Sequence, residues 1–331
     1  MTLNILLLTT FFAVASAYNF LVISPLFGHS HSNFMGTIAD TLTEAGHNVT
    51  VLMPIMDPDM EQRTGLRLTT HVIKVPPDNR TAALFVQKAK FMTRLWNIEP
   101  SVFGMMEMSF NKRQDSKDVL QMSSNVHWGS EGVLKASSNM RRDSEDVPQT
   151  SNLAGLSKVF NDDDVMAALR EMQFDVGIAE AFDICGFGIF ELLNVRATIA
   201  TTSSVRAEVI SKLVGIPAAP SYVPGIMSTK GDEMGMFERL QNVIETVLGS
   251  KFFETLFDME ISAFRKKFGD DFKGYEELLQ QVSYVFTNSN PYLDYPHPTI
   301  HKSVDIGGIA VSFDDHQNSL PEVNIFSFEI L

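Results

Sequence analysis

A strand–helix–strand unit near the N-terminus constrains the fold of this chain more than any other feature. The run at residues 18–25, YNFLVISP, is apolar and rich in β-favouring residues, as a buried parallel strand is. Apolar residues then recur at helical spacing from Met35 to Ala45, and Gly46 suits the left-handed position that ends a helix. Residues 48–54, NVTVLMP, form the next predicted strand. Such units build parallel sheets covered by helices, so the sequence predicts an α/β fold.

Later segments extend the same pattern. A helix is predicted over DDDVMAALREM, residues 162–172, directly before a strand. The further predicted strands are THVIKVP at 70–76, FDVGIAE at 174–180, VRATIATTS at 195–203 and VSYVFTNS at 282–289. Strands that alternate with helices indicate a doubly wound domain with a parallel sheet.

A long amphipathic helix is predicted between Phe237 and Phe268. One of its faces is apolar and carries Phe237, Leu240, Ile244, Val247 and Leu248. We interpret this face as core or as the lid of a pocket. A helix lying on a membrane surface is the alternative, but the polar face lacks the Lys and Arg residues typical of such helices.

The N-terminal residues have the pattern of a secretory signal peptide. An apolar run from Ile5 to Val14 is followed by Ala15-Ser16-Ala17, the small-x-small pattern that signal peptidase cleaves. We therefore expect residues 1–17 to be removed and the mature chain to enter the secretory pathway. No later run reaches the ~18 apolar residues of a membrane span, so no transmembrane helix is expected in the mature chain.

Secretion makes N-glycosylation relevant. The acceptor motifs are Asn48-Val-Thr50 and Asn79-Arg-Thr81, and Asn79 is the better candidate because it follows two prolines in a predicted loop. Cys185 is the only cysteine of the sequence, so no disulfide can form within the chain.

One segment of the chain looks inserted. Residues 113–123, RQDSKDVLQMS, are echoed by residues 141–151, RRDSEDVPQTS, which indicates a partial local duplication. The surrounding region is rich in Ser, Asn and charge and poor in periodic apolar residues. We expect a flexible insert at about residues 111–156.

Two histidines lie where a parallel sheet binds ligands. Ligands of open parallel sheets bind beyond the carboxyl ends of the strands. His29 and His31 are expected in the loop after the first strand, and Glu180 ends a later strand at the same edge. A carboxylate beside an imidazole fixes its tautomer and stabilises the imidazolium, which makes a base able to activate an alcohol. On spacing alone, a solvated histidine in a turn is the alternative.

The residues of the sequence offer little support for a metal site, a glycine-rich nucleotide loop or a nucleic-acid interface. His29 and His31 lack a third ligand for a metal, and the acidic run Asp162–Asp164 starts a predicted helix, where acidic groups favour the macrodipole. No GxGxxG motif or P-loop is found. The net charge of −14 argues against nucleic acid as a partner, because phosphate binding needs clustered Lys and Arg. We expect no metal, no resident cofactor and no nucleic acid.

Four blocks in order resemble the UDP-glucuronosyltransferases of UDP-glycosyltransferase family 1. They are GHSHSNFMGTIADTLTEAGHNVTVL at 28–52, FDVGIAEAFDICGFGIFELLNVRA at 174–197, PAAPSYVPG at 217–225 and FTNSNPYLDYPHPTIHKSVDIGGI at 286–309. The resemblance implies a GT-B fold, in which an N-terminal Rossmann-like domain binds a lipophilic acceptor and a C-terminal domain binds the UDP-sugar. Residues 18–311 would be the acceptor domain and residues 312–331 a divergent tail, with the donor domain absent.

The resemblance also assigns residues to roles. The catalytic histidine lies sixteen residues before the His of Gly46-His47, which gives His31 as the base. Its acidic partner would be Glu180, where many members have Asp, with Asp183 as the alternative. His31 would deprotonate an acceptor hydroxyl that attacks the anomeric carbon of UDP-glucuronate or UDP-glucose with inversion, without metal or covalent intermediate. The UDP-sugar is then a co-substrate rather than a cofactor.

The remaining expectations also follow from the resemblance. Candidate acceptor-binding residues are His29, Phe34 and Tyr222, and the partner is a small lipophilic acceptor. The family implies the endoplasmic reticulum, or secretion if no anchor is present. Whether this chain alone is an enzyme stays open. The alternative function is an inactive acceptor-domain protein that binds a lipophile or a full-length relative.

Overall fold

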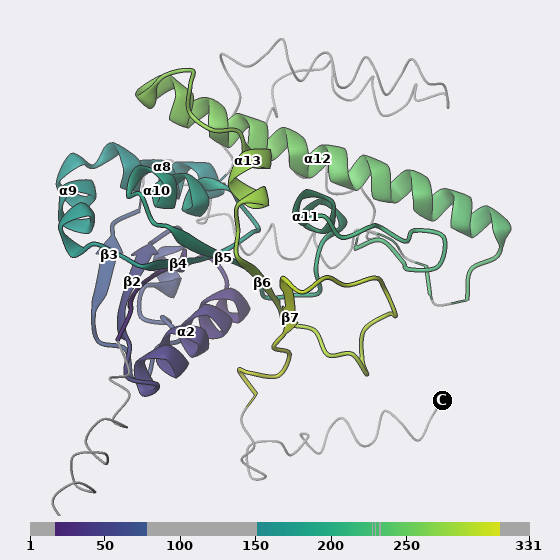
Figure 1. The fold of residues 1–331 in the computed structure, drawn as a ribbon, viewed down its shortest axis with the longest axis horizontal. Coiled ribbons are helices and arrows are strands. Elements are labelled where there is room, and N and C mark those ends of the chain that lie inside the picture. The colour runs from purple at the N-terminus through teal and green to yellow at the C-terminus, as the bar shows by residue number, and fades with distance from the viewer. Residues whose placement is uncertain (1–16, 78–150, 227, 229, 232, 312–331) are drawn as a thin grey trace, which may run out of the picture.

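The computed structural model describes residues 17–77, 151–226, 228, 230–231 and 233–311. Within these residues, a seven-stranded sheet forms the centre of the fold, and helices cover both of its faces (Figure 1). The strand order is β3-β2-β1-β4-β5-β6-β7, and all neighbouring strands are parallel. The chain builds outward from β1 to β3 and then in the other direction from β4 to β7. The predicted α/β fold is confirmed, and its topological switch point lies between β1 and β4.

The strands are short, and the helices vary widely in length. The strands are β1 (Asn19–Ile23), β2 (Asn48–Pro54), β3 (Val72–Val75), β4 (Val176–Glu180), β5 (Ala197–Thr202), β6 (Tyr284–Thr287) and β7 (Ser303–Asp305). The helices are α2 (His29–Glu44), η1 (Pro58–Met60), α8 (Ser151–Asn161), α9 (Asp163–Met172), α10 (Cys185–Leu192), α11 (Glu208–Val214), α12 (Met236–Phe268) and α13 (Tyr275–Gln280).

Several predictions fall outside this part of the chain. They include almost all of the signal peptide, most of the insert, Asn79 and the tail at 312–331. The predicted insert extends too far at its C-terminal end, because residues 151–156 belong to α8. The predicted strand at 48–54 matches β2, whereas β7 was not predicted, because it has three residues and alternates polar with apolar side chains too briefly to give a pattern.

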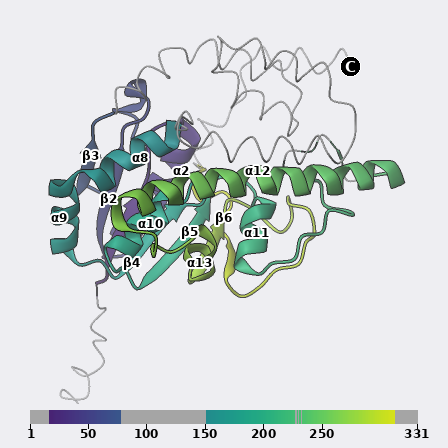
Figure 2. The same ribbon diagram turned by 90° about the horizontal axis from the view of Figure 1, so that it is seen from above.

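The two faces of the sheet have separate apolar cores. Alternate residues of a strand point to opposite faces, so Phe20 and Val22 pack on the side of α2, whereas Leu21 and Ile23 pack on the other side. The second face is covered by helices from α8 to α13, which lie along it together (Figure 2). This double coverage explains why β1 is apolar from Phe20 to Ile23.

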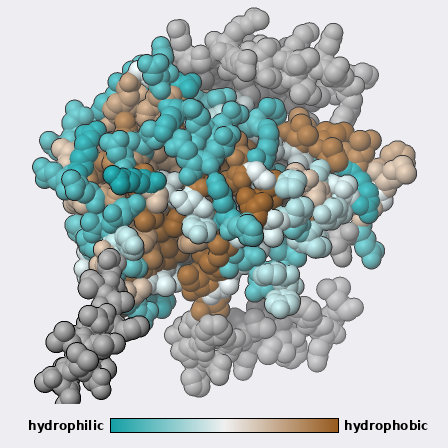
Figure 3. Space-filling model, in the orientation of Figure 1, coloured by the Kyte–Doolittle hydropathy of each residue, from teal (hydrophilic) through white to brown (hydrophobic). Residues whose placement is uncertain are grey.

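The long helix α12 buries the opposite face from the one expected. Phe237, Leu240, Ile244 and Val247 are exposed, with Phe237 at 86% of its surface, and Figure 3 shows apolar surface over this end of α12. The buried side carries Asn242, whose Nδ2 donates to the carbonyls of Pro220 (2.7 Å) and Val223 (2.8 Å). The interpretation of these four residues as core was therefore wrong, whereas Leu248 is partly buried. Hydrogen bonds to the 220–225 turn fix which side of the helix packs.

The length and polarity of the described helices decide whether one of them could span a membrane. Each of them is either too short or too polar to cross a bilayer.

Candidate active site

The two histidines lie in the first turn of a helix and not in a loop as expected. Helix α2 begins at His29 because the Ser32 amide already donates to the Gly28 carbonyl at 3.1 Å. The Ser32 hydroxyl is buried and bonds to the same carbonyl at 3.2 Å. Gly28 has no side chain to cap the helix, so no capping hydroxyl or carboxylate marks a start this early.

His31 and Glu180 meet at the switch point of the sheet. His31 follows β1, Glu180 ends β4, and these strands are parallel neighbours, so their carboxyl ends share an edge. The His31 Nδ1 lies 2.7 Å from the Glu180 Oε2. The imidazole side chain is 24% exposed and the carboxylate side chain 9%. The structure thus brings the two residues together in a half-buried position that solutes can reach.

Ser203 completes this group, and the sequence analysis did not identify it. Its amide and its hydroxyl both donate to the Glu180 Oε1, at 2.9 Å and 2.5 Å. The same hydroxyl oxygen lies 3.0 Å from the His31 Nδ1. Ser203 directly follows β5, the neighbour of β4, so a polar residue after a third strand of the sheet was the available signal.

These contacts define the tautomer that the site favours. An ionised carboxylate only accepts hydrogen bonds, so the Nδ1 that faces Glu180 carries the proton. The Nε2 of His31 then holds a lone pair and can take a proton from a ligand. Gly28 leaves room at this edge of the ring, because a Cβ there would lie 3.1 Å from the His31 Cδ2.

Aromatic rings line the region beside His31. The centroid of the Phe27 ring lies 4.4 Å from that of His31, and the Phe182 ring lies 5.7 Å away. Phe182 contacts Phe253 of α12 at 6.4 Å and is 46% exposed, which is unusual for so large an apolar side chain. The imidazole therefore lies against an aromatic wall that a flat apolar ligand could cover.

Asp183, the alternative partner of His31, lies in a different environment. It is buried, and its Oδ1 accepts the Cys185 amide at 3.1 Å. The side-chain oxygen and sulfur atoms of Asp183, Cys185 and Glu260 lie within 4.8 Å of one another. Burial raises the pKa of Asp183 to about 7, and burial together with the Asp183 charge raises that of Glu260. Asp183 thus faces a second carboxyl group, whereas Glu180 faces the imidazole.

This buried cluster has the donor types of a metal site but is satisfied by the protein. The Glu260 Oε2 accepts the Ile184 amide at 2.7 Å, and Asp183 accepts backbone amides of α10. Carboxylates that point at backbone N–H groups are held as acceptors by the chain itself. The cluster therefore ties α12 to the turn after β4.

The predicted acceptor-binding residues differ in exposure. His29 is exposed at the start of α2, and Tyr222 is 42% exposed in the turn at 220–225. Phe34 is 2% exposed and belongs to the core between α2 and the sheet. An acceptor could reach His29 and Tyr222 directly, but Phe34 only if α2 moved. Asn48 is exposed, although it starts β2, and its Nδ2 donates to the Asn19 Oδ1 at 3.0 Å.

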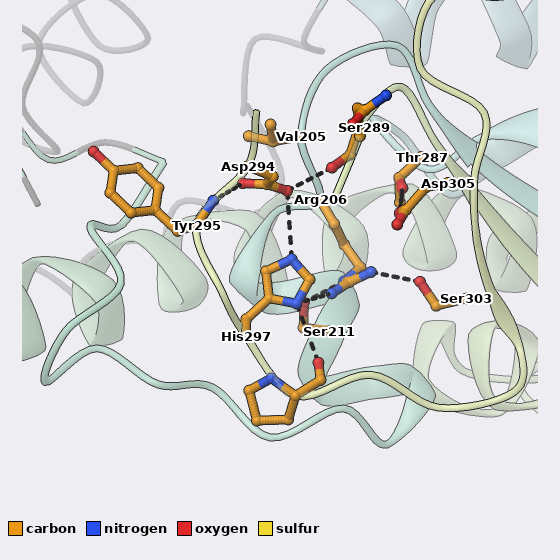
Figure 4. Close-up of polar contacts among 12 residues, drawn as sticks. Val205, Arg206, Ser211, Thr287, Ser289, Asp294, Tyr295, His297, Ser303 and Asp305 are labelled. Carbon is orange, nitrogen blue, oxygen red and sulfur yellow. Dashed lines mark hydrogen bonds and ion pairs between the residues drawn. The ribbon is translucent and has the colours of Figure 1, made fainter. Parts of the chain in front are cut away.

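A second polar network supports the loops next to the site (Figure 4). Arg206 donates to the hydroxyls of Ser211 (2.9 Å) and Ser303 (2.6 Å) and to the His297 Nδ1 (3.2 Å). His297 in turn contacts Asp294 through its Nε2 at 3.4 Å. Burial lowers the pKa of Arg206, although its side chain stays a cation in the ordinary range of pH. The network joins the segment after β5 to the loop between β6 and β7.

Comparisons with known proteins show the family of the chain. The family model described as "UDP-glucoronosyl and UDP-glucosyl transferase" matches residues 20–325. The Caenorhabditis elegans protein named as UDP-glucuronosyltransferase ugt-47 is 27% identical over 309 residues, which cover 92% of this chain and 49% of the relative. The mouse UDP-glucuronosyltransferase 2B17 is 26% identical over 287 residues, which cover 85% of this chain and 47% of the relative.

Among solved structures, the glycosyltransferase VinC in complex with dTDP is 15% identical, with a TM-score of 0.41 over 87% of this chain and 52% of that one. The chain spans about half the length of the curated relatives it matches. Because the family model covers most of the chain, the chain belongs to the UDP-glucuronosyl and UDP-glucosyl transferase family.

Proposed function

We propose that this chain supplies the acceptor-binding half and the general base of an inverting UDP-glycosyltransferase. The observation that carries the proposal is the 2.7 Å contact between the His31 Nδ1 and the Glu180 Oε2 at the switch point of the sheet. The UDP-sugar would be bound by a second half, which we assign to the part of the relatives that this chain does not span.

The transfer reaction that we propose uses the His31 tautomer with the proton on Nδ1. The Nε2 of His31 takes the proton of an acceptor hydroxyl while the hydroxyl oxygen attacks the anomeric carbon of the sugar. The bond from that carbon to the UDP oxygen breaks, and UDP leaves with the electron pair. Attack from the side opposite the leaving group inverts the anomeric configuration. Glu180 stabilises the imidazolium that forms, and a general base of this kind contributes about 10²–10⁴-fold in rate.

The aromatic wall indicates the class of acceptor. Phe27 and Phe182 lie beside the imidazole, and Phe253 lies against Phe182 and extends this apolar surface. Flat apolar molecules bind such surfaces, and a hydroxyl at their edge would reach the base. A phenol is therefore the acceptor that fits best, and the sugar is either glucuronate or glucose.

The N-terminal pattern bears on where this chemistry takes place. The apolar run before Ala17 suits a protein of the secretory pathway. The endoplasmic reticulum lumen is the compartment that we propose.

A transfer assay tests the proposed function. Membranes from cells that express the whole reading frame containing this chain would be given 1-naphthol with UDP-glucuronate or UDP-glucose. We expect His31→Ala to lower the transfer rate by about 10²–10⁴-fold, the share that a general base supplies, with acceptor binding retained. The control is His301→Ala, an exposed histidine that precedes β7 at the opposite edge of the sheet.

Two outcomes would count against the proposal. Retained transfer in His31→Ala would refute His31 as the base. Binding of 1-naphthol without transfer from either UDP-sugar would favour the alternative function, an acceptor-domain protein that binds a lipophile without turnover.

A further inference from the structure

We infer that Ser203 is a positioning residue for the base, and that its hydroxyl selects the tautomer of His31 through Glu180. The inference rests on the proposed function, since it names a further residue of the same site. It goes beyond the two-residue arrangement of base and acid, because it adds the serine hydroxyl as a third member that orients them.

The first step concerns the freedom of the Glu180 side chain. Glutamate is long and loses much rotamer freedom when it is fixed, so one contact to an imidazole leaves its carboxylate loosely oriented. Here both oxygens are engaged, Oε2 by His31 at 2.7 Å and Oε1 by the amide and hydroxyl of Ser203. Two donors on one oxygen fix the plane of the carboxylate and therefore the direction of its bond to the ring.

The second step concerns the direction of the hydroxyl proton. A serine hydroxyl has one proton to donate and two lone pairs to accept with. The 2.5 Å contact to Glu180 Oε1 uses the proton, so the hydroxyl presents a lone pair to the His31 Nδ1 at 3.0 Å. Both neighbours of Nδ1, the carboxylate and the hydroxyl, then act as acceptors. The proton is held on Nδ1, and Nε2 stays free to act as the base.

The opposite tautomer would break this set of contacts. If Nδ1 carried no proton, its lone pair would face the Glu180 Oε2 at 2.7 Å, acceptor against acceptor. Only the Ser203 hydroxyl could relieve Nδ1 by donating to it, and Glu180 Oε1 would then lose its 2.5 Å contact. The serine therefore links the state of the carboxylate to the state of the ring.

The third step concerns what holds Ser203 in place. Ser203 follows β5, and Asn288 follows β6, the next parallel strand. The side-chain Nδ2 of Asn288 donates to the Ser203 carbonyl at 2.8 Å, and the backbone N–H of Asn288 donates to the Thr202 carbonyl at 3.0 Å. Glu180, Ser203 and Asn288 thus stand at the ends of three consecutive strands, so the sheet itself sets the position of the hydroxyl.

The experiment reads the tautomer of His31 directly. Two-bond ¹⁵N–¹H spectra of the ¹⁵N-labelled chain distinguish the Nδ1–H from the Nε2–H form of a neutral histidine. We expect the unmodified chain to show mainly Nδ1–H, and Ser203→Ala to show comparable amounts of both forms. The matched control is Ser204→Ala, the exposed neighbour whose hydroxyl bonds to the Val205 carbonyl.

Two further variants keep the test sharp. Ser203→Thr keeps a hydroxyl and should retain the Nδ1–H form, whereas Ser203→Cys keeps the size with a weak donor and should behave like the alanine variant. In the transfer assay with the whole reading frame, Ser203→Ala should lower kcat about 10-fold with the KM for 1-naphthol unchanged, as small misplacement of a catalytic group does.

The outcomes separate this inference from the proposed function. If Ser203→Ala and Ser204→Ala give the same His31 tautomer, the inference is overturned, whatever the transfer rates are. If the tautomer shifts in Ser203→Ala but none of the proteins transfers sugar, the positioning role stands and the proposed function fails.

Discussion

Glu180 and Asp183 are three residues apart, yet the fold gives them opposite surroundings. Glu180 ends a strand and accepts hydrogen bonds from Ser203 beside a half-buried imidazole. Asp183 lies in the turn after the strand, buried next to the carboxyl group of Glu260. Hydrogen-bond donors point at the carboxylate of Glu180, whereas burial beside a second acid favours the protonated form of Asp183. Environments that differ in this way give two nearby acids different chemical roles.

The secondary-structure element that carries each acid, more than its residue type, decides its role. Both residues are acids, and both were candidates for the partner of His31 on sequence grounds. The strand end directs Glu180 to the edge of the sheet where β1 and β4 meet, whereas the turn folds Asp183 back under α10 and against α12. One acid is therefore available to a ligand site and the other to the interior.

The largest expected effect distinguishes these two acids by activity. We expect Glu180→Gln to lower the transfer rate by about 10²–10⁴-fold, because an amide can donate to Nδ1 and favour the wrong tautomer. Asp183→Asn should stay within about threefold of the unmodified protein near pH 6, since an asparagine resembles the protonated acid. Equal losses in the two variants would show that the comparison is mistaken. Initial rates with 1-naphthol measure both.

The next effect concerns stability. The pKa of Asp183 is about 7 in the folded protein against an ordinary value of 3.8, so the folded state keeps a proton that the unfolded state releases between those values. The free energy of unfolding should therefore fall as the pH rises from about 4 to 7, by at most roughly 1.4 kcal/mol per pH unit from this group, and level off above 7. Glu260 adds a contribution of the same sign, because its pKa is also raised.

Denaturant unfolding between pH 4.5 and 8 measures this slope. Asp183→Asn should flatten it and make the protein more stable than the unmodified chain at pH 8. Asp164→Asn, an exposed acid in the first turn of α9, is the matched control and should leave the slope unchanged. A slope that is the same in all three proteins would contradict the buried, protonated state of Asp183.

A smaller effect is expected at the aromatic wall. Phe182→Ala should raise the KM for 1-naphthol about 10-fold, which corresponds to ~1.4 kcal/mol of binding, with kcat little changed. Phe237→Ala, which removes an exposed ring at the far end of α12, should leave both constants unchanged. A fall in kcat without a rise in KM would place Phe182 in support of His31 and not in acceptor binding.

The sequence predicted the sheet well because strands carry a local signal. The bounds of β2 and the position of Glu180 at the end of β4 follow from short apolar runs and from the rule that ligands meet carboxyl ends. The choice of His31 over His29 came from the family resemblance, since spacing alone did not separate them. In the structure, His31 contacts Glu180, and His29, two residues earlier on α2, is exposed.

What the sequence did not reveal depends on tertiary contacts. Periodicity shows that α12 has an apolar face but not that Asn242 would bind the 220–225 turn and turn that face outward. Ser203 was included in a predicted strand, and its role appears only when β4 and β5 lie side by side. The raised pKa of Asp183 likewise comes first from burial of the carboxyl group, which the tertiary fold and not the neighbouring sequence provides.

A crystal structure of the chain with bound 1-naphthol tests the central claim most directly, namely that His31 faces the acceptor as its base. We expect the naphthol oxygen within about 3 Å of the His31 Nε2, the distance that proton transfer requires, with its rings against Phe182. A naphthol bound elsewhere, or with its oxygen turned away from Nε2 while His31 still contacts Glu180, would contradict the account.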